Sequence, residues 1–166
     1  TPPPVIPEKT GATADYGWWR NPKILTTLKA AMRSIFLTLF HRLKILIVDD
    51  NMPFRSAVSM MVKGEPSMEV VGEADTGMAA VRLASELSPD VVLMDVHMPG
   101  PFGGVEATRR IVRAADREGA GPMVIGFSAA DEERPAMLEA GAIGFIPKSE
   151  AIELIDRIKG VMNIAS

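Results

Sequence analysis

Five short apolar runs alternate with five amphipathic segments between Lys44 and Asn163, and this alternation most constrains the fold. The predicted strands are KILIVDD, MEVVGEA, DVVLMDV, PMVIGFSA and AIGFIPKS. The segments that follow them carry apolar residues at helical spacing. Repeated strand–helix units imply right-handed crossovers, and therefore a parallel sheet with helices on both faces. The nearly continuous apolar strands agree, because strands of such a sheet are buried on both sides.

Polar side chains stand where four of these strands end. The first strand ends at Asp49 and Asp50, and the third ends at Asp95. The fourth ends at Ser128, and the fifth ends at Lys148. The carboxyl ends of parallel strands share one edge of a sheet, and ligands bind beyond that edge. We therefore expect three carboxylates, a hydroxyl and an amine to converge there.

Three carboxylates in close proximity raise one another's pKa values unless something neutralises them. Oxygen donors without sulfur suit a hard divalent cation, so we expect Mg²⁺. The sequence has no cysteine, which excludes a disulfide framework and thiolate metal sites. Such a site suits phosphoryl transfer, with Asp95 as the nucleophile. Lys148 and Ser128 are expected to contact the phosphoryl oxygens rather than to build the fold.

These motifs resemble the receiver domain of bacterial two-component response regulators, most closely its NarL/FixJ-like branch. The resemblance rests on KILIVDD, VVLMDVHMPG, VIGFSA and GFIPKS, and it runs from Lys44 to Asn163. It implies an α/β, flavodoxin-like sheet of five parallel strands in the order 2-1-3-4-5. It also implies phosphorylation on aspartate, with Mg²⁺, by a histidine kinase or a phosphotransfer protein.

The resemblance also implies a metal site and an acceptor. Asp49 and Asp50 correspond to the acidic pair, and Asp95 corresponds to the phosphoacceptor. The same three carboxylates would bind Mg²⁺ together with the backbone carbonyl of His97, whose side chain we expect to be solvated. From the residues alone, an ordinary turn and helix cap remains the alternative for the two aspartates after the first strand.

The resemblance also implies which residues respond to phosphorylation. Ser128 corresponds to the hydroxyl switch and Lys148 to the essential lysine, while Phe145 corresponds to the aromatic switch. An inert hydroxyl at a strand end is the alternative for Ser128. Core packing is the alternative for Phe145, since aromatic residues in strands usually pack in the interior.

Two segments depart from the family pattern. The loop PGPFGGVE is longer than usual and lacks an acidic cap before the helix. The segment from Ser128 to Lys148 is shorter than usual, and the shortening falls in DEERPAMLEAG, which predicts a stunted fourth helix. Because that helix belongs to the output face in this family, we do not assume the usual dimer surface.

Several functions remain open beside a stand-alone phosphorylated switch. The chain could be a receiver fragment of a hybrid histidine kinase or a pseudo-receiver that only binds partners. A phosphatase with an aspartate nucleophile would typically carry a second acid two residues further on, where this chain has His97. We expect no enzymatic activity beyond its own phosphorylation and dephosphorylation. No helix-turn-helix pattern follows the last unit, so these residues are not expected to bind nucleic acid.

An N-terminal extension, residues 1–43, is expected to precede the receiver domain, residues 44–166. Its start, through Tyr16, is rich in Pro and Gly and predicts disorder. Asn21 and Pro22 predict the start of a helix. The segment that follows is basic and amphipathic, with its apolar face at Leu25, Leu28, Met32, Ile35, Phe36, Leu39 and Leu43.

This helix needs a partner surface, because an isolated apolar helix is marginal in water. Seven basic and two acidic residues precede Ile45, a net +5, which leaves −8 for the rest of a chain whose total is −3. This asymmetry favours docking on the acidic receiver or on a second copy in a homodimer. Trp18 and Trp19 indicate an anionic membrane surface as the second option. No signal peptide or membrane span is visible, so we expect a cytoplasmic protein, with peripheral membrane contact through this helix as that second option.

Overall fold

The computed structural model describes residues 42–118, 121–129 and 131–162. The extension therefore lies outside the described residues except for its last two positions. The prediction for Leu43 is wrong: it is the first residue of strand β1 (Leu43–Val48), not part of a helix. Leu43 pairs with Met68 of the neighbouring strand and is 8% exposed. Helical and strand patterns overlap at this residue, and pairing within the sheet decides between them.

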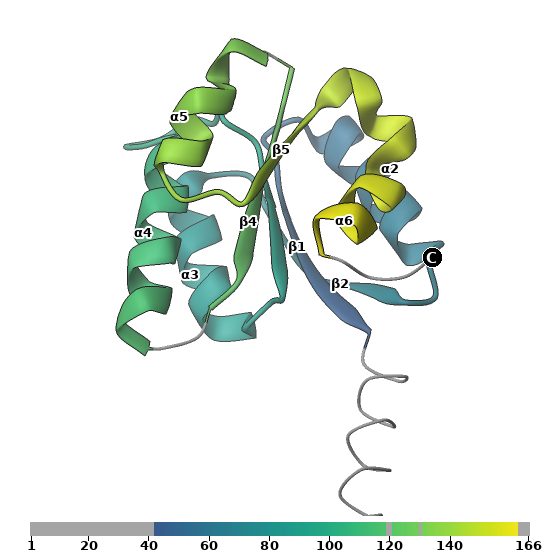
Figure 1. The fold of residues 1–166 in the computed structure, drawn as a ribbon, viewed down its shortest axis with the longest axis horizontal. Helices are drawn as coiled ribbons and strands as arrows, with labels where there is room; N and C mark the ends of the chain where they lie inside the picture. The colour runs from purple at the N-terminus through teal and green to yellow at the C-terminus, as the bar shows by residue number, and fades with distance from the viewer. Residues whose placement is uncertain (1–41, 119–120, 130, 163–166) are drawn as a thin grey trace, which may run out of the picture. The chain divides into compact units, whose positions relative to one another are not determined.

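Five parallel strands form one sheet in the order β2-β1-β3-β4-β5, which confirms the predicted order (Figure 1). The strands after β1 are β2 (Met68–Ala74), β3 (Val91–Met94), β4 (Met123–Ser128) and β5 (Gly144–Pro147). The order reverses direction between β1 and β3. A functional site is expected beyond the carboxyl ends of the strands at such a switch point.

Within the described residues, five helices cover the two faces of this sheet and complete the predicted flavodoxin-like architecture. They are α2 (Met52–Lys63), α3 (Gly77–Leu87), α4 (Gly104–Glu118), α5 (Arg134–Glu139) and α6 (Leu154–Val161), with 3₁₀ turns η2 (Asp131–Glu133) and η3 (Lys148–Glu153). Helices α2 and α6 lie on one face, and α3, α4 and α5 lie on the other (Figure 1). Over the part of the chain that is described, no helix has the length and apolarity needed to cross a membrane.

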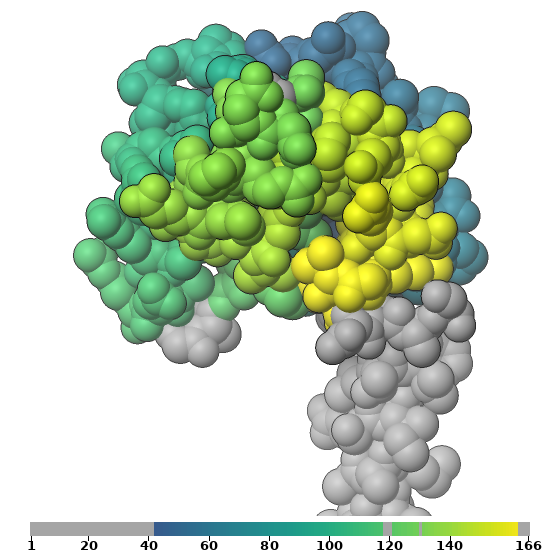
Figure 2. Space-filling view, turned by 45° about the horizontal axis from the view of Figure 1, so that its top comes forward, coloured from purple at the N-terminus to yellow at the C-terminus, as the bar shows by residue number. Residues whose placement is uncertain are grey.

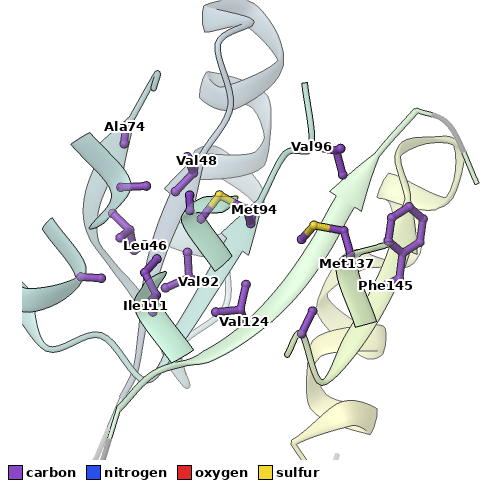
Figure 3. Close-up of a cluster of buried hydrophobic side chains, with 14 residues drawn as sticks. Leu46, Val48, Ala74, Val92, Met94, Val96, Ile111, Val124, Met137 and Phe145 are labelled. Atoms are coloured by element: carbon purple, nitrogen blue, oxygen red, sulfur yellow. The ribbon is translucent and has the colours of Figure 1, made fainter. Parts of the chain in front are cut away.

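Two hydrophobic clusters sandwich the sheet. In β1, Ile45 and Ile47 belong to the cluster under α2 and α6, whereas Leu46 and Val48 belong to the cluster under α3, α4 and α5. Figure 3 shows the second cluster, in which strand and helix side chains meet. All four β1 residues are at most 1% exposed. Burial on both faces explains why the strands are continuous apolar runs, and each such side chain contributes about 1.5–3 kcal/mol.

The fourth helix of the receiver pattern, α5, has only six residues, in agreement with the shortened segment. Pro135 lies in its first turn, where the missing N–H is not needed. Met137 is its buried anchor, whereas Leu138 is 45% exposed. Figure 2 shows that the chain from β4 to α6, coloured green to yellow, forms most of the face turned toward the viewer. The short helix thus contributes little buried surface beyond one methionine.

Candidate functional site

Three aspartates meet at the carboxyl edge of the sheet. Asp49 directly follows β1 and Asp95 directly follows β3, two strands that pair with Val48 opposite Met94. The Asp95 N–H donates to the Val48 carbonyl at 2.9 Å, which fixes Asp95 beside the end of β1. Asp49, Asp50 and Asp95 each offer one oxygen, and these oxygens all lie within 4.8 Å of one another.

Lys148 bridges two of these carboxylates. It directly follows β5, and its Nζ lies 2.6 Å from Asp49 Oδ2 and 2.9 Å from Asp95 Oδ2. The side chains of Asp49 and Asp95 are only 3% and 6% exposed. Nζ also lies 4.8 Å from the centre of the Phe54 ring on α2, a cation–π distance. One ammonium group therefore serves as the counter-ion of two buried acids.

The electrostatic balance at this edge is negative. Burial raises the pKa of Asp95 above its ordinary value and outweighs the opposing effect of Lys148, and the charge of Asp49 raises it further. Burial alone would lower the pKa of Lys148, but its hydrogen bonds and ion pairs with Asp49 and Asp95 raise it. Lys148 is therefore an ammonium ion at neutral pH. With Asp50 included, three carboxylates face one cation, which favours binding of a further positive charge.

The carboxylate oxygens at this edge fit a hard cation. Asp49 Oδ1 accepts from the Asn51 N–H at 2.9 Å, and Asp95 Oδ1 accepts from the Val96 N–H at 2.8 Å, so one oxygen of each group is fixed by backbone. Asp49 Oδ2 is buried, and among the described residues the Lys148 ammonium is its one partner. Asp50 is exposed. Oxygen donors with one open side suit Mg²⁺, which keeps several waters.

A glycine allows helix α4 to begin against the acceptor. A Cβ atom on Gly104 would lie 1.8 Å from the Asp95 carbonyl oxygen, so no other residue fits there. The Gly104 N–H donates to the Val96 carbonyl at 2.9 Å. The long loop before α4 is anchored by Phe102, whose ring lies 4.0 Å from the guanidinium carbon of Arg110. The extra loop length is therefore held against α4.

Ser128 is buried at the end of β4, but its hydroxyl already has a partner. Its Oγ donates to Glu133 Oε2 at 2.8 Å. In the sheet, Ser128 lies opposite Pro147 of β5, the residue before Lys148. The other oxygen of Glu133 contacts Nε2 of His97. Sequence reasoning missed Glu133, because the acidic run DEE carries no periodic signal. The His97 side chain is 73% exposed and yet paired, and its backbone carbonyl as a metal ligand remains a prediction.

Phe145 lies in β5 with its side chain turned inward, and it is 8% exposed. Its ring packs over Gly126, where a Cβ atom would lie 2.7 Å from the ring, and beside Met137 (Figure 3). The guanidinium carbon of Arg134 lies 5.1 Å from the ring centre. The contacts agree with the packing role, and the switch role remains a prediction.

Arg55 of α2 is a second residue that the sequence did not reveal. Its Nη1 donates to the Asp49 carbonyl at 2.6 Å, and its Nε lies 3.3 Å from Glu73 Oε2. Ser59 donates to the other oxygen of Glu73 at 2.8 Å. This network ties α2 and β2 to the end of β1. It fixes the backbone that carries Asp49, although no side chain in it reaches the acidic cluster itself.

Comparisons with known proteins agree on one family. The family model of the response regulator receiver domain matches residues 45–159. The response regulator GacA of Pseudomonas aeruginosa is 39% identical over 111 residues, which cover 67% of this chain and 50% of GacA. The signal receiver domain of NarL from Mycobacterium tuberculosis superposes with a TM-score of 0.60 at 31% identity, over 72% of this chain and 98% of that domain.

A third relative was solved as a metal complex. The receiver domain of the histidine kinase CKI1 from Arabidopsis thaliana, complexed with Mg²⁺, has a TM-score of 0.61 at 28% identity, over 74% of this chain and 94% of that domain. The chain spans about half the length of the curated relatives that it matches. The matched region contains β2 to β5, β1 from Ile45 onward, and the acidic edge. The chain therefore belongs to the response regulator receiver domain family.

Proposed function

We propose that this receiver domain accepts a phosphoryl group on Asp95 in a two-component phosphorelay and then controls a partner. One observation carries the proposal. A single ammonium, that of Lys148, pairs with both Asp49 and Asp95, while Asp50 adds a third carboxylate on the open side. This arrangement suits an acceptor that must meet an anionic donor.

The transfer itself needs only one nucleophile. An oxygen of the Asp95 carboxylate forms a bond to the phosphorus of the donor. The bond from phosphorus to the donor nitrogen or oxygen breaks, and its electron pair leaves with the donor. Asp95 Oδ1 is held by the Val96 N–H, so Oδ2 beside Lys148 is the oxygen that we assign to the attack. Lys148 then donates to the phosphoryl oxygens as a charged hydrogen-bond donor.

We propose that Mg²⁺ is held by Asp49, Asp50 and Asp95 with the backbone carbonyl of His97. When bound, the ion would cancel charge on the carboxylates and on the phosphoryl oxygens. The close approach of the Asp49, Asp50 and Asp95 oxygens and the exposed position of Asp50 support this assignment. The Mg²⁺ in the CKI1 receiver domain supports it as an analogy with a relative.

The proposed switch consists of Ser128 and Phe145. Phosphorylation offers the Ser128 hydroxyl a new acceptor, and Phe145 lies on the adjacent strand β5. A change at Ser128 can therefore pass to β5 and the short helix α5 through packed side chains. Because α5 is short, we propose that this output does not depend on a long α5 surface.

The donor is a histidine kinase or a phosphotransfer protein, the class that the family implies. A receiver within a hybrid kinase is the second candidate, favoured by the likeness to the CKI1 receiver domain. A pseudo-receiver has less support, because the residues that phosphorylation needs are all present. They are the acidic pair Asp49 and Asp50, the acceptor Asp95, the hydroxyl of Ser128 and the amine of Lys148. We propose no enzymatic activity beyond phosphorylation and dephosphorylation of the chain itself. A cytoplasmic location and a homodimer remain predictions, and so does membrane contact through residues 1–43.

Intact-mass measurement tests this function. The protein is incubated with acetyl phosphate and Mg²⁺, and a gain of one phosphoryl group is expected in the wild type. Asp95→Asn should abolish the gain, whereas Asp75→Asn, at an exposed position outside the acidic cluster, should retain it. An equal gain in Asp95→Asn would refute the assignment of the acceptor. No gain in the wild type would favour the pseudo-receiver.

A further inference from the structure

The carboxylate of Glu133 connects the two loops that flank the acceptor. Oε2 accepts from the Ser128 hydroxyl at 2.8 Å, and Oε1 contacts His97 Nε2. Ser128 is the last residue of β4, and His97 lies two residues after Asp95. One side chain from the start of α5 therefore spans the loops that follow β3 and β4.

Glu133 differs from its acidic neighbours in both burial and bonding. Its side chain is 18% exposed, and Ser128 is 1% exposed, whereas Asp131 and Glu132 are exposed. It occupies the N-cap position of α5, where a carboxylate would ordinarily accept from backbone amides, but it makes no such bond. Asp131 instead pairs with Arg134 at 2.8 Å. The Glu133 side chain is thus committed to Ser128 and His97.

We propose that Glu133 is a positioning residue that occupies the Ser128 hydroxyl in the unphosphorylated protein and competes with the phosphoryl group for it. This inference rests on the proposed role of Asp95 as the acceptor. A hydroxyl has one hydrogen to donate, so Ser128 bonds either Glu133 or a phosphoryl oxygen. An aspartyl phosphate also repels a nearby carboxylate. Phosphorylation therefore releases Glu133 at the same time as it captures Ser128.

The release has a direct route to the core. Glu133 is followed by Arg134, whose guanidinium covers the ring of Phe145 at 5.1 Å. Glu133 and Arg134 lie at the junction of η2 and α5, and η2 has no buried side chain of its own. Movement of Glu133 changes the position of Arg134 and hence the support of the Phe145 ring. Glu133 thereby couples the hydroxyl of Ser128 to the aromatic residue in β5.

Rates of phosphorylation test the competition. The mass gain is followed over time with acetyl phosphate and Mg²⁺ for Glu133→Ala, Glu133→Gln and the control Glu132→Ala. Glu133→Ala should accelerate the gain by roughly threefold to tenfold, the factor that a single hydrogen bond typically supplies. Glu133→Gln should fall between it and the wild type, because a neutral amide oxygen accepts a weaker bond. Glu132→Ala should match the wild type.

A double-mutant cycle identifies the route of the effect. In a Ser128→Ala background, Glu133→Ala should change the rate little, because the hydroxyl for which it competes is gone. Equal acceleration in that background would overturn the inference, since a merely electrostatic effect on the donor needs no Ser128. Wild-type rates in both Glu133 variants would also overturn it. Absence of any mass gain in all variants, wild type included, would instead refute the proposed function itself.

Discussion

The ammonium group of Lys148 lies 2.6 Å from Oδ2 of Asp49, although the strands that carry the two residues are not neighbours. Asp49 follows β1 and Lys148 follows β5, with β3 and β4 between these two strands in the sheet. The ion pair therefore links strands that share no backbone hydrogen bonds. The same ammonium also contacts Oδ2 of Asp95, the residue after β3, at 2.9 Å. Any event that redirects Lys148 must alter contacts at both central and edge strands.

Replacing Lys148 with alanine should destabilise the metal-free protein. The change leaves two buried carboxylates without their counter-ion and hydrogen-bond donor, which should cost about 1–3 kcal/mol of unfolding free energy at neutral pH. Sequence reasoning assigned Lys148 to phosphate contact only, whereas the geometry argues that it also supports the fold. Urea unfolding in chelator measures the effect, and Mg²⁺ should restore part of it. Lys63→Ala, at an exposed site, should be nearly neutral, and equal effects would contradict the argument.

Asp95→Asn should stabilise the metal-free protein at neutral pH. The pKa of Asp95 is raised in the folded state, so folding favours its protonated form and its ionisation costs stability. The wild type should therefore lose stability as pH rises above the ordinary aspartate value of 3.8. The asparagine variant lacks this loss and should therefore be more stable than the wild type at pH 7. Melting curves across pH test this, and a difference that does not shrink on acidification would refute it.

Mg²⁺ should raise the melting temperature, and Asp50→Ala should remove most of that increase. A ligand that binds only the folded state stabilises it by about 2.7 kcal/mol at one hundred times its dissociation constant. Each carboxylate matters to a hard cation, so loss of the exposed Asp50 should weaken binding by about tenfold or more. Calorimetric titration measures the affinity. Asp116→Ala on α4 serves as an exposed acidic control, and equal affinity in both variants would refute the assignment.

Sequence reasoning predicted the architecture well because the inner strands β1, β3 and β4 are buried on both faces. Apolar runs such as Ile45 to Val48 have no competing interpretation once helical segments separate them. The acidic edge was also predictable, since parallel strands bring their ends together. Asp49 and Asp95 needed only the alternation of elements and the strand order to be placed side by side.

The contacts within the site were harder to predict from the sequence. Glu133 lies in an acidic run without periodicity, and its partners Ser128 and His97 come from two other loops. Arg55 donates to a backbone carbonyl, and because every residue has one, the sequence does not identify this partner. The start of β1 was misplaced because Leu43 fits both an apolar helical face and an apolar strand. Local patterns therefore predict elements, whereas pairings across loops require coordinates.

The link between α6 and the loop after α2 should be sensitive to acid. Lys159 Nζ lies 3.0 Å from Glu65 Oε2, and Ser67 donates two hydrogen bonds to Glu65 Oε1. The hydrogen bonds from Ser67 and Lys159 lower the pKa of Glu65 from 4.5 to about 2. A lowered pKa stabilises the fold above pH 4.5, and the contribution is lost as pH falls toward 2. Glu65→Gln should therefore melt lower than the wild type at pH 7 and approach it in acid. Glu69→Gln is the matched control, because Glu69 lies farther from its basic partner: Oε2 is 3.8 Å from Arg42 Nη1.

Two truncations that differ by two residues should separate the extension from the receiver fold. The compact unit begins at Arg42, which contacts the Met68 carbonyl and lies 3.8 Å from Glu69 of β2. Deleting residues 1–41 retains these contacts and the whole of β1, so the free energy of unfolding and phosphorylation on Asp95 should be preserved. Deleting residues 1–43 removes buried Leu43 as well and should cost about 1–3 kcal/mol. Urea unfolding of both proteins measures the difference, and a shorter deletion that fails to fold would show that the receiver needs the extension.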